Sequence, residues 1–329
     1  MFALQTVMRV AFVGKGGSGK STLTALFYLH ILEQMKTVLL IDADLNIHLP
    51  QLLNVTVPEH LALSLSNNAS WIREHLRGNS KHIHSIDHIY KTTPPSKGVN
   101  LLELRTNDPI LSRFTTQNKT GFIAIIGTYE KNEIGRSCYH TNLSILENLL
   151  SFAKLELDEW IVVDMVAGID AFSNTLHQQF DLLVLTVEPT HESVSVYKQY
   201  IELAQHAQME NSIIVIGNKI EDSSDNEYLK SVIDARHYLG GFKKLDTIKS
   251  ARRNQHPLSL DLIQDEDRLL LERVQDLAVQ FVQDPNDRLK TLHKLHLHYI
   301  AQDYVRNAAG DLSHQIDQDF SFTSSINSI

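Results

Sequence analysis

The stretch Gly14-Lys15-Gly16-Gly17-Ser18-Gly19-Lys20-Ser21 decides the fold of this chain. It matches the pattern G-x-x-x-x-G-K-[ST] and lies between an apolar run at Arg9–Val13 and a helix-length stretch at Ser21–Gln34. In that context the pattern predicts a phosphate-binding loop, whose backbone N–H groups curl around phosphates at a helix N-terminus. We therefore expect this loop, together with Thr22 after it, to bind a nucleotide. The alternative is a glycine-rich turn without a ligand.

Two side chains are expected to carry the chemistry of the loop. In this motif the lysine, here Lys20, places its charge on the β- and γ-phosphates, and the hydroxyl, here Ser21, binds Mg²⁺. The motif thus indicates ATP and Mg²⁺ as ligands. We expect Lys20 to be exposed when no nucleotide is bound, so that Lys20→Ala would remove nucleotide binding and leave the fold intact.

Short apolar runs recur along the first 220 residues, and helix-length stretches separate most of them. Such runs are typical of strands buried on both faces, and their alternation with helices predicts an α/β fold with a doubly wound, mainly parallel sheet. Ligands bind such sheets at the carboxyl ends of the strands. Residues 55–120 interrupt the alternation and are interpreted as an irregular excursion. The expected strands are Arg9–Val13, Thr37–Ile41, Phe122–Ile126, Trp160–Val163, Leu182–Val187 and Ile213–Ile216.

Acidic side chains follow two of these strands. Asp42 and Asp44 end the second strand two residues apart, so their side chains point to the same side. One of the two can hold magnesium-bound water while the other orients an attacking water, unless both merely end a strand. Asp164 ends the strand Trp160–Val163 and is followed by Gly168, a pattern in which the acid belongs to the magnesium shell and the glycine amide approaches the γ-phosphate.

Asn218 is a candidate for reading the base of the nucleotide. It follows the strand Ile213–Ile216, and its amide offers one donor and one acceptor, which match the edge of adenine. An ordinary turn is the alternative at this position.

The second lysine of the loop, Lys15, points to a family. Lys-Gly-Gly-x-Gly-Lys-Ser-Thr resembles the deviant Walker A ATPases, which include septum-site and plasmid-partitioning ATPases. The resemblance implies a homodimer that closes face to face over two ATP molecules, with Lys15 reaching the partner's phosphates. It also implies a metal-side role for Asp42 and a water-positioning role for Asp44. A solvated loop lysine is the alternative for Lys15.

Within that family the chain looks most similar to the nickel-insertion chaperones of carbon monoxide dehydrogenase, over roughly residues 8–260. The similarity rests on the segments starting at Asp42, Asp164, Val187 and Gly217. Those chaperones carry Cys-x-Cys where this chain has Cys138-Tyr139-His140. Cysteine and histidine both bind Zn²⁺ or Ni²⁺, so Cys138 and His140 of two subunits could complete one site at the dimer axis. A buried cysteine beside a surface histidine is the alternative.

Composition limits the class of protein. The chain has 329 residues, a formal net charge of −9 and one cysteine, which excludes an intrachain disulfide framework. Its apolar runs are far shorter than the roughly 18 residues of a membrane span. We therefore expect a cytoplasmic protein that does not enter membranes. Nucleic-acid binding would need a local patch, for which Lys243, Lys244, Lys249, Arg252 and Arg253 are the candidates. A solvated face or a rim of the nucleotide site is the favoured alternative for these residues.

The chain is expected to divide into an ATPase domain, residues 1–260, and a C-terminal helical appendage with a tail, residues 261–329. Two amphipathic helices are expected in the appendage, at Ile263–Val282 and Asp287–Arg306. The histidines of residues 82–88 and 293–298 are interpreted as surface residues. The resulting hypothesis is an ATP-hydrolysing dimer switch that serves a client protein in maturation or metal handling. The alternative is a positioning ATPase that binds DNA or a partner surface, and a kinase-like transferase is a weaker third reading.

Overall fold

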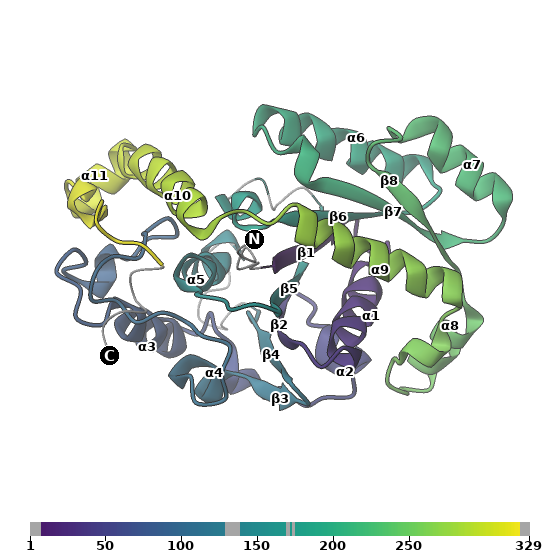
Figure 1. Ribbon diagram of the computed structural model, residues 1–329, viewed down its shortest axis with the longest axis horizontal. Helices are drawn as coiled ribbons and strands as arrows, with labels where there is room; N and C mark the ends of the chain where they lie inside the picture. Colours follow the sequence, from purple (N-terminus) through teal and green to yellow (C-terminus); the bar gives the residue numbers. More distant parts are fainter. Residues whose placement is uncertain (1–7, 129–138, 169–171, 173–174, 323–329) are drawn as a thin grey trace, which may run out of the picture.

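The computed structural model describes residues 8–128, 139–168, 172 and 175–322, and its centre is one eight-stranded sheet (Figure 1). The strand order is β3-β4-β2-β5-β1-β6-β7-β8. Every pairing is parallel except that between β3 and β4. The predicted α/β fold with a mainly parallel sheet is therefore confirmed. The strands are β1 (Met8–Gly14), β2 (Thr37–Ala43), β3 (Thr116–Asn118), β4 (Gly121–Ile125), β5 (Glu159–Met165), β6 (Leu182–Val187), β7 (Ile213–Ile220) and β8 (Tyr238–Lys243).

Helices cover both faces of the sheet (Figure 1). Alternate residues of β1 enter different cores: Val10 and Phe12 pack on one face, and Ala11 and Val13 on the other. This period of two is expected for a strand buried on both faces. The α-helices are α1 (Lys20–Glu33), α2 (Leu49–Leu52), α3 (Ser66–Arg77), α4 (Pro109–Phe114), α5 (Tyr139–Phe152), α6 (His191–His206), α7 (Ser223–Val232), α8 (Asp246–Arg253), α9 (Asp265–Gln280), α10 (Pro285–Ile300) and α11 (Asp303–Ala309).

The strand order brings the expected site residues to one edge of the sheet. β1 lies between β5 and β6, and β5 also pairs with β2. In this register Asp164 of β5 lies opposite Phe12 of β1 on one side and Asp42 of β2 on the other. The loop that follows β1 therefore starts next to both acidic strand ends, as expected for ligand binding at the carboxyl ends of parallel strands.

The chain departs from the sequence-based expectations in two regions. Residues 55–120 are not irregular throughout, because they contain α3, α4 and β3. Three apolar residues of α3, Ala69, Ile72 and Leu76, are buried against the sheet. The second C-terminal helix is divided: α10 ends at Ile300, and α11 begins at Asp303.

The C-terminal helices pack in two different places. α9 buries Leu270, Leu271 and Val274 in the same core as α1 and β1. α10 is anchored where Arg288 donates to the carbonyl of Gln179 at 2.8 Å and forms a buried ion pair with Asp181. The division of the chain at residue 260 stays a prediction, and α9 shares its core with the ATPase domain proposed there.

A segment that follows α11 contacts residues 55–120, the region that interrupts the alternation of strands and helices. Asp317 accepts a hydrogen bond from the Lys97 amide at 2.8 Å, and the Thr92 hydroxyl lies 3.1 Å from Nδ1 of His296 in α10. His296 is fully buried, so the prediction of surface histidines is wrong at this position. These two contacts join residues that are 220 and 204 positions apart in the sequence. None of the described helices is long and apolar enough to cross a membrane.

Glu147 of α5 is a buried carboxylate that should make stability depend on pH. Its Oε1 accepts a hydrogen bond from Thr175 at 2.5 Å, while Oε2 has no hydrogen-bond partner in the described parts of the chain. Burial raises the pKa of Glu147 to about 7, against the opposing effects of Thr175 and Lys91. A raised pKa means that the carboxyl group stabilises the fold at acidic pH and loses this contribution as pH rises toward 7.

We expect Glu147→Gln, which stays neutral, to gain stability relative to the wild type between pH 5 and pH 8. The gain should be on the order of 2–3 kcal/mol, because each unit of pKa shift corresponds to about 1.4 kcal/mol. Urea denaturation at both pH values measures it. Glu202→Gln on the exposed side of α6 is the matched control and should show no such change. If the free energy of unfolding changed with pH in the same way for Glu147→Gln and the wild type, the raised pKa of Glu147 would be contradicted.

Candidate functional site

The loop between β1 and α1 has the backbone shape that a phosphate-binding loop requires. Gly17 and Gly19 have φ angles of 83° and 93°, in the left-handed region that favours glycine. Gly14, with φ of 146°, is held against β6, where an added Cβ would lie 2.6 Å from the carbonyl oxygen of Thr186. The Ser18 amide donates to the Lys15 carbonyl at 3.1 Å, which closes the turn. Helix α1 then begins at Lys20, so its N-terminus faces the loop.

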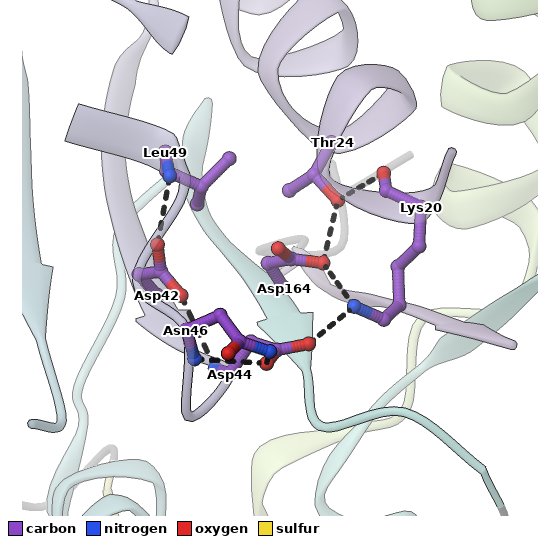
Figure 2. A network of polar contacts seen from close by, with 7 residues as sticks. All are labelled: Lys20, Thr24, Asp42, Asp44, Asn46, Leu49 and Asp164. Carbon is purple, nitrogen blue, oxygen red and sulfur yellow. Dashed lines mark hydrogen bonds and ion pairs between the residues drawn. The ribbon is translucent and has the colours of Figure 1, made fainter. Parts of the chain in front are cut away.

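Lys20 connects the loop to two acidic strand ends (Figure 2). Its Nζ lies 2.8 Å from Oδ2 of Asp44 and 3.3 Å from Oδ1 of Asp164. Only 5% of the Lys20 surface is exposed. The prediction of an exposed Lys20 is therefore wrong, because the carboxylates after β2 and in β5 surround the ammonium group.

Asp42 shapes the loop that follows β2. Its Oδ1 accepts a hydrogen bond from the Asp44 amide at 3.1 Å, and its Oδ2 accepts one from the Leu49 amide at 2.8 Å (Figure 2). Asp44 in turn accepts from the backbone amide and the side-chain amide of Asn46. Asp42 thus fixes the backbone that aims Asp44 at Lys20. The proposed metal-side role of Asp42 stays a prediction.

Asp164 has the donor set expected beside a magnesium ion. Its Oδ1 accepts a hydrogen bond from Thr24 at 3.3 Å, and the nearby Ser21 hydroxyl acts to lower the pKa of this carboxyl group against the effect of burial. Its Oδ2 is buried and has no hydrogen-bond partner among the residues described here. A buried carboxylate oxygen without a partner, next to the Ser21 hydroxyl, fits a hard cation that prefers oxygen ligands.

Burial and charge shift the pKa values of this cluster in opposite directions. Burial raises the pKa of Asp42 to about 7, with a further contribution from Asp164, and burial also raises the pKa of Asp164. Burial would raise the pKa of Asp44 as well, but Lys20 outweighs it and lowers that pKa. Burial would lower the pKa of Lys20, and the two carboxylates raise it instead. The pair Lys20–Asp44 is therefore ionised, and a cation is favoured beside the other two acids.

Asn218 of β7 contacts the phosphate-binding loop from the other side. Its Nδ2 donates to the Ser18 carbonyl at 2.6 Å, so the donor half of the amide holds the loop. The next residue, Lys219, donates to the Gly17 carbonyl at 2.7 Å and pairs with Glu188. The described conformation leaves the Asn218 oxygen for a base, and a two-point contact with adenine would require Nδ2 to leave Ser18.

We expect Asn218→Ala to reduce the preference for ATP over GTP. The loss should correspond to about 1–3 kcal/mol, the range for one bidentate base contact, with the low end expected if only the oxygen reads the base. Competitive titration with both nucleotides measures the ratio. Lys219→Ala is the control. It removes a contact to the same loop, but a lysine side chain has no acceptor with which to recognise a base. An unchanged ATP to GTP ratio in Asn218→Ala would assign this residue to loop support alone.

The structure shows where Gly168 and Lys15 lie, but it does not test the roles predicted for them. The amide of Gly168 donates to the Gly14 carbonyl at 3.0 Å, so the segment after β5 already contacts the phosphate-binding loop. Its proposed contact with a γ-phosphate would replace this bond. Lys15 is half-exposed, and none of the described residues holds its side chain by a hydrogen bond or ion pair. Both assignments stay predictions.

A cavity of about 630 Å³ adjoins the loop. Its lining includes Gly19, Thr22 and Asn218 as well as residues of α8. The basic residues Lys243, Lys244, Lys249, Arg252 and Arg253 line this cavity, and whether they serve a nucleotide or DNA stays a prediction. Apolar side chains, namely Leu52, Phe242, Leu245 and Ile248, also line this cavity.

The transition-metal prediction falls on residues that the structure does not describe. Cys138 and the side chain of His140, a residue in the first turn of α5, lie outside the described part of the chain. The described residues contain no group of three or more His, Cys, Asp or Glu side chains that could hold a metal ion. The proposed Zn²⁺ or Ni²⁺ site at Cys138 and His140 therefore stays a prediction.

Three site residues were missed in the sequence: Thr24, Lys219 and Glu188. Thr24 is one helical turn after Lys20 in α1, a spacing that places it on the same side of the helix and could have revealed it. Lys219 has a left-handed backbone with φ of 60°, which turns its side chain to the loop. No sequence signal indicates such a conformation at a lysine.

The comparisons with known proteins agree with this geometry. The chain is 25% identical over 226 residues to an uncharacterised ATP-binding protein of Methanocaldococcus jannaschii, a match covering 68% of this chain and 84% of that protein. It is 24% identical over 244 residues to the carbon monoxide dehydrogenase accessory protein CooC of Rhodospirillum rubrum, covering 74% and 86%.

Among solved structures, the septum site-determining protein MinD of Pyrococcus horikoshii OT3, complexed with Mg-ADP, shares the fold. The TM-score is 0.52 at 17% identity, over 84% of this chain and 99% of that chain. The family described as the CobQ/CobB/MinD/ParA nucleotide binding domain matches residues 10–258. That match covers the loop, both acidic strand ends and Asn218, and the chain belongs to this family of P-loop nucleotide-binding proteins.

Proposed function

We propose that the chain binds and hydrolyses ATP, closes as a homodimer over two nucleotides, and acts as an accessory protein in the maturation or metal supply of a client protein. The observation that carries the proposal is the buried cluster of Lys20, Asp44 and Asp164 beside the glycine-rich loop. The names of the relatives support it, since one is an ATP-binding protein and another is a carbon monoxide dehydrogenase accessory protein.

The cluster indicates how nucleotide binding would activate the site. Without nucleotide, Lys20 is paired with both carboxylates. A triphosphate in the loop competes for the Lys20 ammonium, which releases Asp44 to accept a hydrogen bond from water. Mg²⁺, when bound by Ser21 and Asp164, supplies positive charge to the phosphates. Asp44 then orients the water whose oxygen attacks the γ-phosphorus, the bond to the ADP oxygen breaks, and the proton of the water leaves with the inorganic phosphate.

Dimerisation is proposed from Lys15. This lysine is part of the loop and is half-exposed, and no carboxylate of the described residues forms an ion pair with it. A charge held at the rim without a partner suits the phosphates of a nucleotide bound by a second copy. That arrangement resembles an arginine finger supplied in trans, which stabilises the charge of the transition state.

The accessory role is favoured over the positioning role by two observations. The similarity to CooC extends over 86% of that protein. The basic stretch on which DNA binding would depend lines a cavity beside the loop, which favours a small ligand. A cytoplasmic location is part of this proposal.

We expect metal uptake to depend on ATP if Cys138 and His140 of two subunits share one ion. Open monomers offer half of the ligands, so the closed dimer should bind one Zn²⁺ or Ni²⁺ with higher affinity, and by linkage the metal should stabilise the ATP dimer by the same factor. Metal stoichiometry is measured on slow-hydrolysing Asp44→Ala with and without ATP, and on the same background with Cys138→Ser. Equal and weak uptake in all four samples would contradict the metal-handling role.

A further inference from the structure

We propose that the cavity beside the loop contains a second phosphate subsite, formed by Lys249, Arg252 and Arg253 of α8. Its ligand is a phosphomonoester group located on the nucleoside side of the bound nucleotide. The inference rests on the proposed nucleotide binding of the loop and goes beyond it, because ATP has no phosphate in that half of the cavity.

The charge of the cavity lining carries the proposal. Six cationic side chains line it, Lys219, Lys243, Lys244, Lys249, Arg252 and Arg253, and no aspartate or glutamate does. Three of the six are neutralised by carboxylates outside the lining, through the ion pairs Lys219–Glu188, Lys243–Glu266 and Lys244–Glu221. The other three are exposed and have no hydrogen-bond or ion-pair partner in the described ranges of the chain.

The triphosphate of ATP does not account for these three cations. Its charges would lie at the glycine-rich loop, beside Lys20 and the N-terminus of α1. The base and ribose that would extend into the cavity are neutral. Asn218 and apolar residues such as Phe242 and Ile248 line the cavity and could contact these neutral groups. An uncompensated positive charge on this side indicates an additional anionic group.

The placement of the cations favours a small phosphate over a long polyanion. Arg252 and Arg253 are in the last turn of α8, where the helix dipole stabilises cations. The helix dipole does not explain why Lys249 is positively charged at this place. It also does not explain why the cavity lining contains no aspartate or glutamate. The three side chains line a concave cavity shared with Gly19 and Thr22, whereas a nucleic-acid backbone needs an open track of cations. Arginine pairs bidentately with phosphate, which suits a single phosphomonoester.

The phosphate can come from two sources that share this chemistry. It can be a 2′- or 3′-phosphate on the same nucleotide, or a separate small phosphorylated compound bound beside it. The test compares, by isothermal titration calorimetry of the full chain, ADP, ADP carrying a 2′- or 3′-phosphate, and ADP in the presence of pyrophosphate.

We expect one of the phosphorylated analogues to bind about tenfold or more tightly than ADP, the effect of one or two charge-assisted hydrogen bonds. If the source is a separate compound, pyrophosphate should bind to the ADP complex instead. The gain should disappear in Arg252→Gln/Arg253→Gln and in Lys249→Gln. Lys230→Gln on α7, which removes an exposed charge outside the cavity, should keep it. Thermal unfolding of each variant checks that it is folded.

The outcomes separate this inference from the proposed function. Failure to bind ADP in any form would overturn the nucleotide site itself. Normal ADP binding without any gain from an added phosphate or from pyrophosphate would overturn the subsite and leave the ATPase proposal standing. Duplex DNA that competes with ADP, and whose binding depends on Arg252 and Arg253, would also overturn it in favour of a nucleic-acid surface.

Discussion

Replacing Lys20 with alanine is expected to weaken ATP binding by about 10²-fold or more. In this motif the Lys20 ammonium group is the charge that contacts the β- and γ-phosphates, and charge-assisted hydrogen bonds to phosphate are among the strongest that proteins make. The backbone of Gly17 and Gly19 would stay in place, but it offers only partial charges. Calorimetric titration with ATP measures the loss, and Lys15→Ala is the matched control, since each monomer should still bind ATP without it.

The same substitution should destabilise the protein, contrary to what an exposed lysine would imply. Without Lys20, the carboxylates of Asp44 and Asp164 are left unpaired in a buried cluster. Removing one partner of a buried ion pair typically costs about 3–5 kcal/mol. The double variant Lys20→Ala/Asp44→Asn should recover part of this loss, because one of the two unpaired charges is removed. Unchanged ATP affinity in folded Lys20→Ala would overturn the assignment of the loop.

Asp44→Ala is expected to slow ATP turnover by roughly 10²-fold to 10⁴-fold, the range lost with a group that handles protons or orients water. ATP binding should be retained or become tighter, because Lys20 no longer has to leave Asp44 before it can contact phosphate. The variant should therefore accumulate in its nucleotide-bound form. Phosphate release measured under saturating ATP gives the rate.

Asn46→Ala is the matched control for Asp44→Ala. Asn46→Ala removes the hydrogen bond that the Asn46 side chain donates to Asp44 but keeps the one from its backbone amide, so it should disturb the orientation of the carboxylate only slightly and slow turnover by less than about tenfold. Wild-type turnover in folded Asp44→Ala would show that another group positions the water.

The central strands and the acidic site residues could be predicted because one pattern specifies both. Strands buried on both faces need continuous apolar runs, and the polar residue that ends such a run must lie at the sheet edge. Asp44, Asp164 and Asn218 follow from this rule, whereas Lys20 follows from the motif of the glycine-rich loop, and the structure brings all four to one edge. β8 does not follow from it, because Gly240 and Gly241 interrupt its apolar pattern.

The contacts between these residues could not be predicted. The sequence indicates that Lys20 is near phosphate, but the buried ion pairs that it forms without nucleotide depend on the register of β2 against β5. Asn218 was chosen for the chemistry of its amide, yet its donor is used by Ser18. The end of α10 at Ile300 is marked by neither glycine nor proline, so the break before α11 depends on tertiary packing.

The measurement that tests the central proposal most directly is the mass of Asp44→Ala in solution with ATP and Mg²⁺, determined by light scattering. The proposal predicts a dimer with ATP and a monomer without it. Asp44→Ala/Lys15→Ala should stay monomeric under both conditions, because the charge offered to the partner's phosphates is absent. An Asp44→Ala protein that binds ATP and remains a monomer, or a Lys15→Ala background that dimerises normally, would contradict the account.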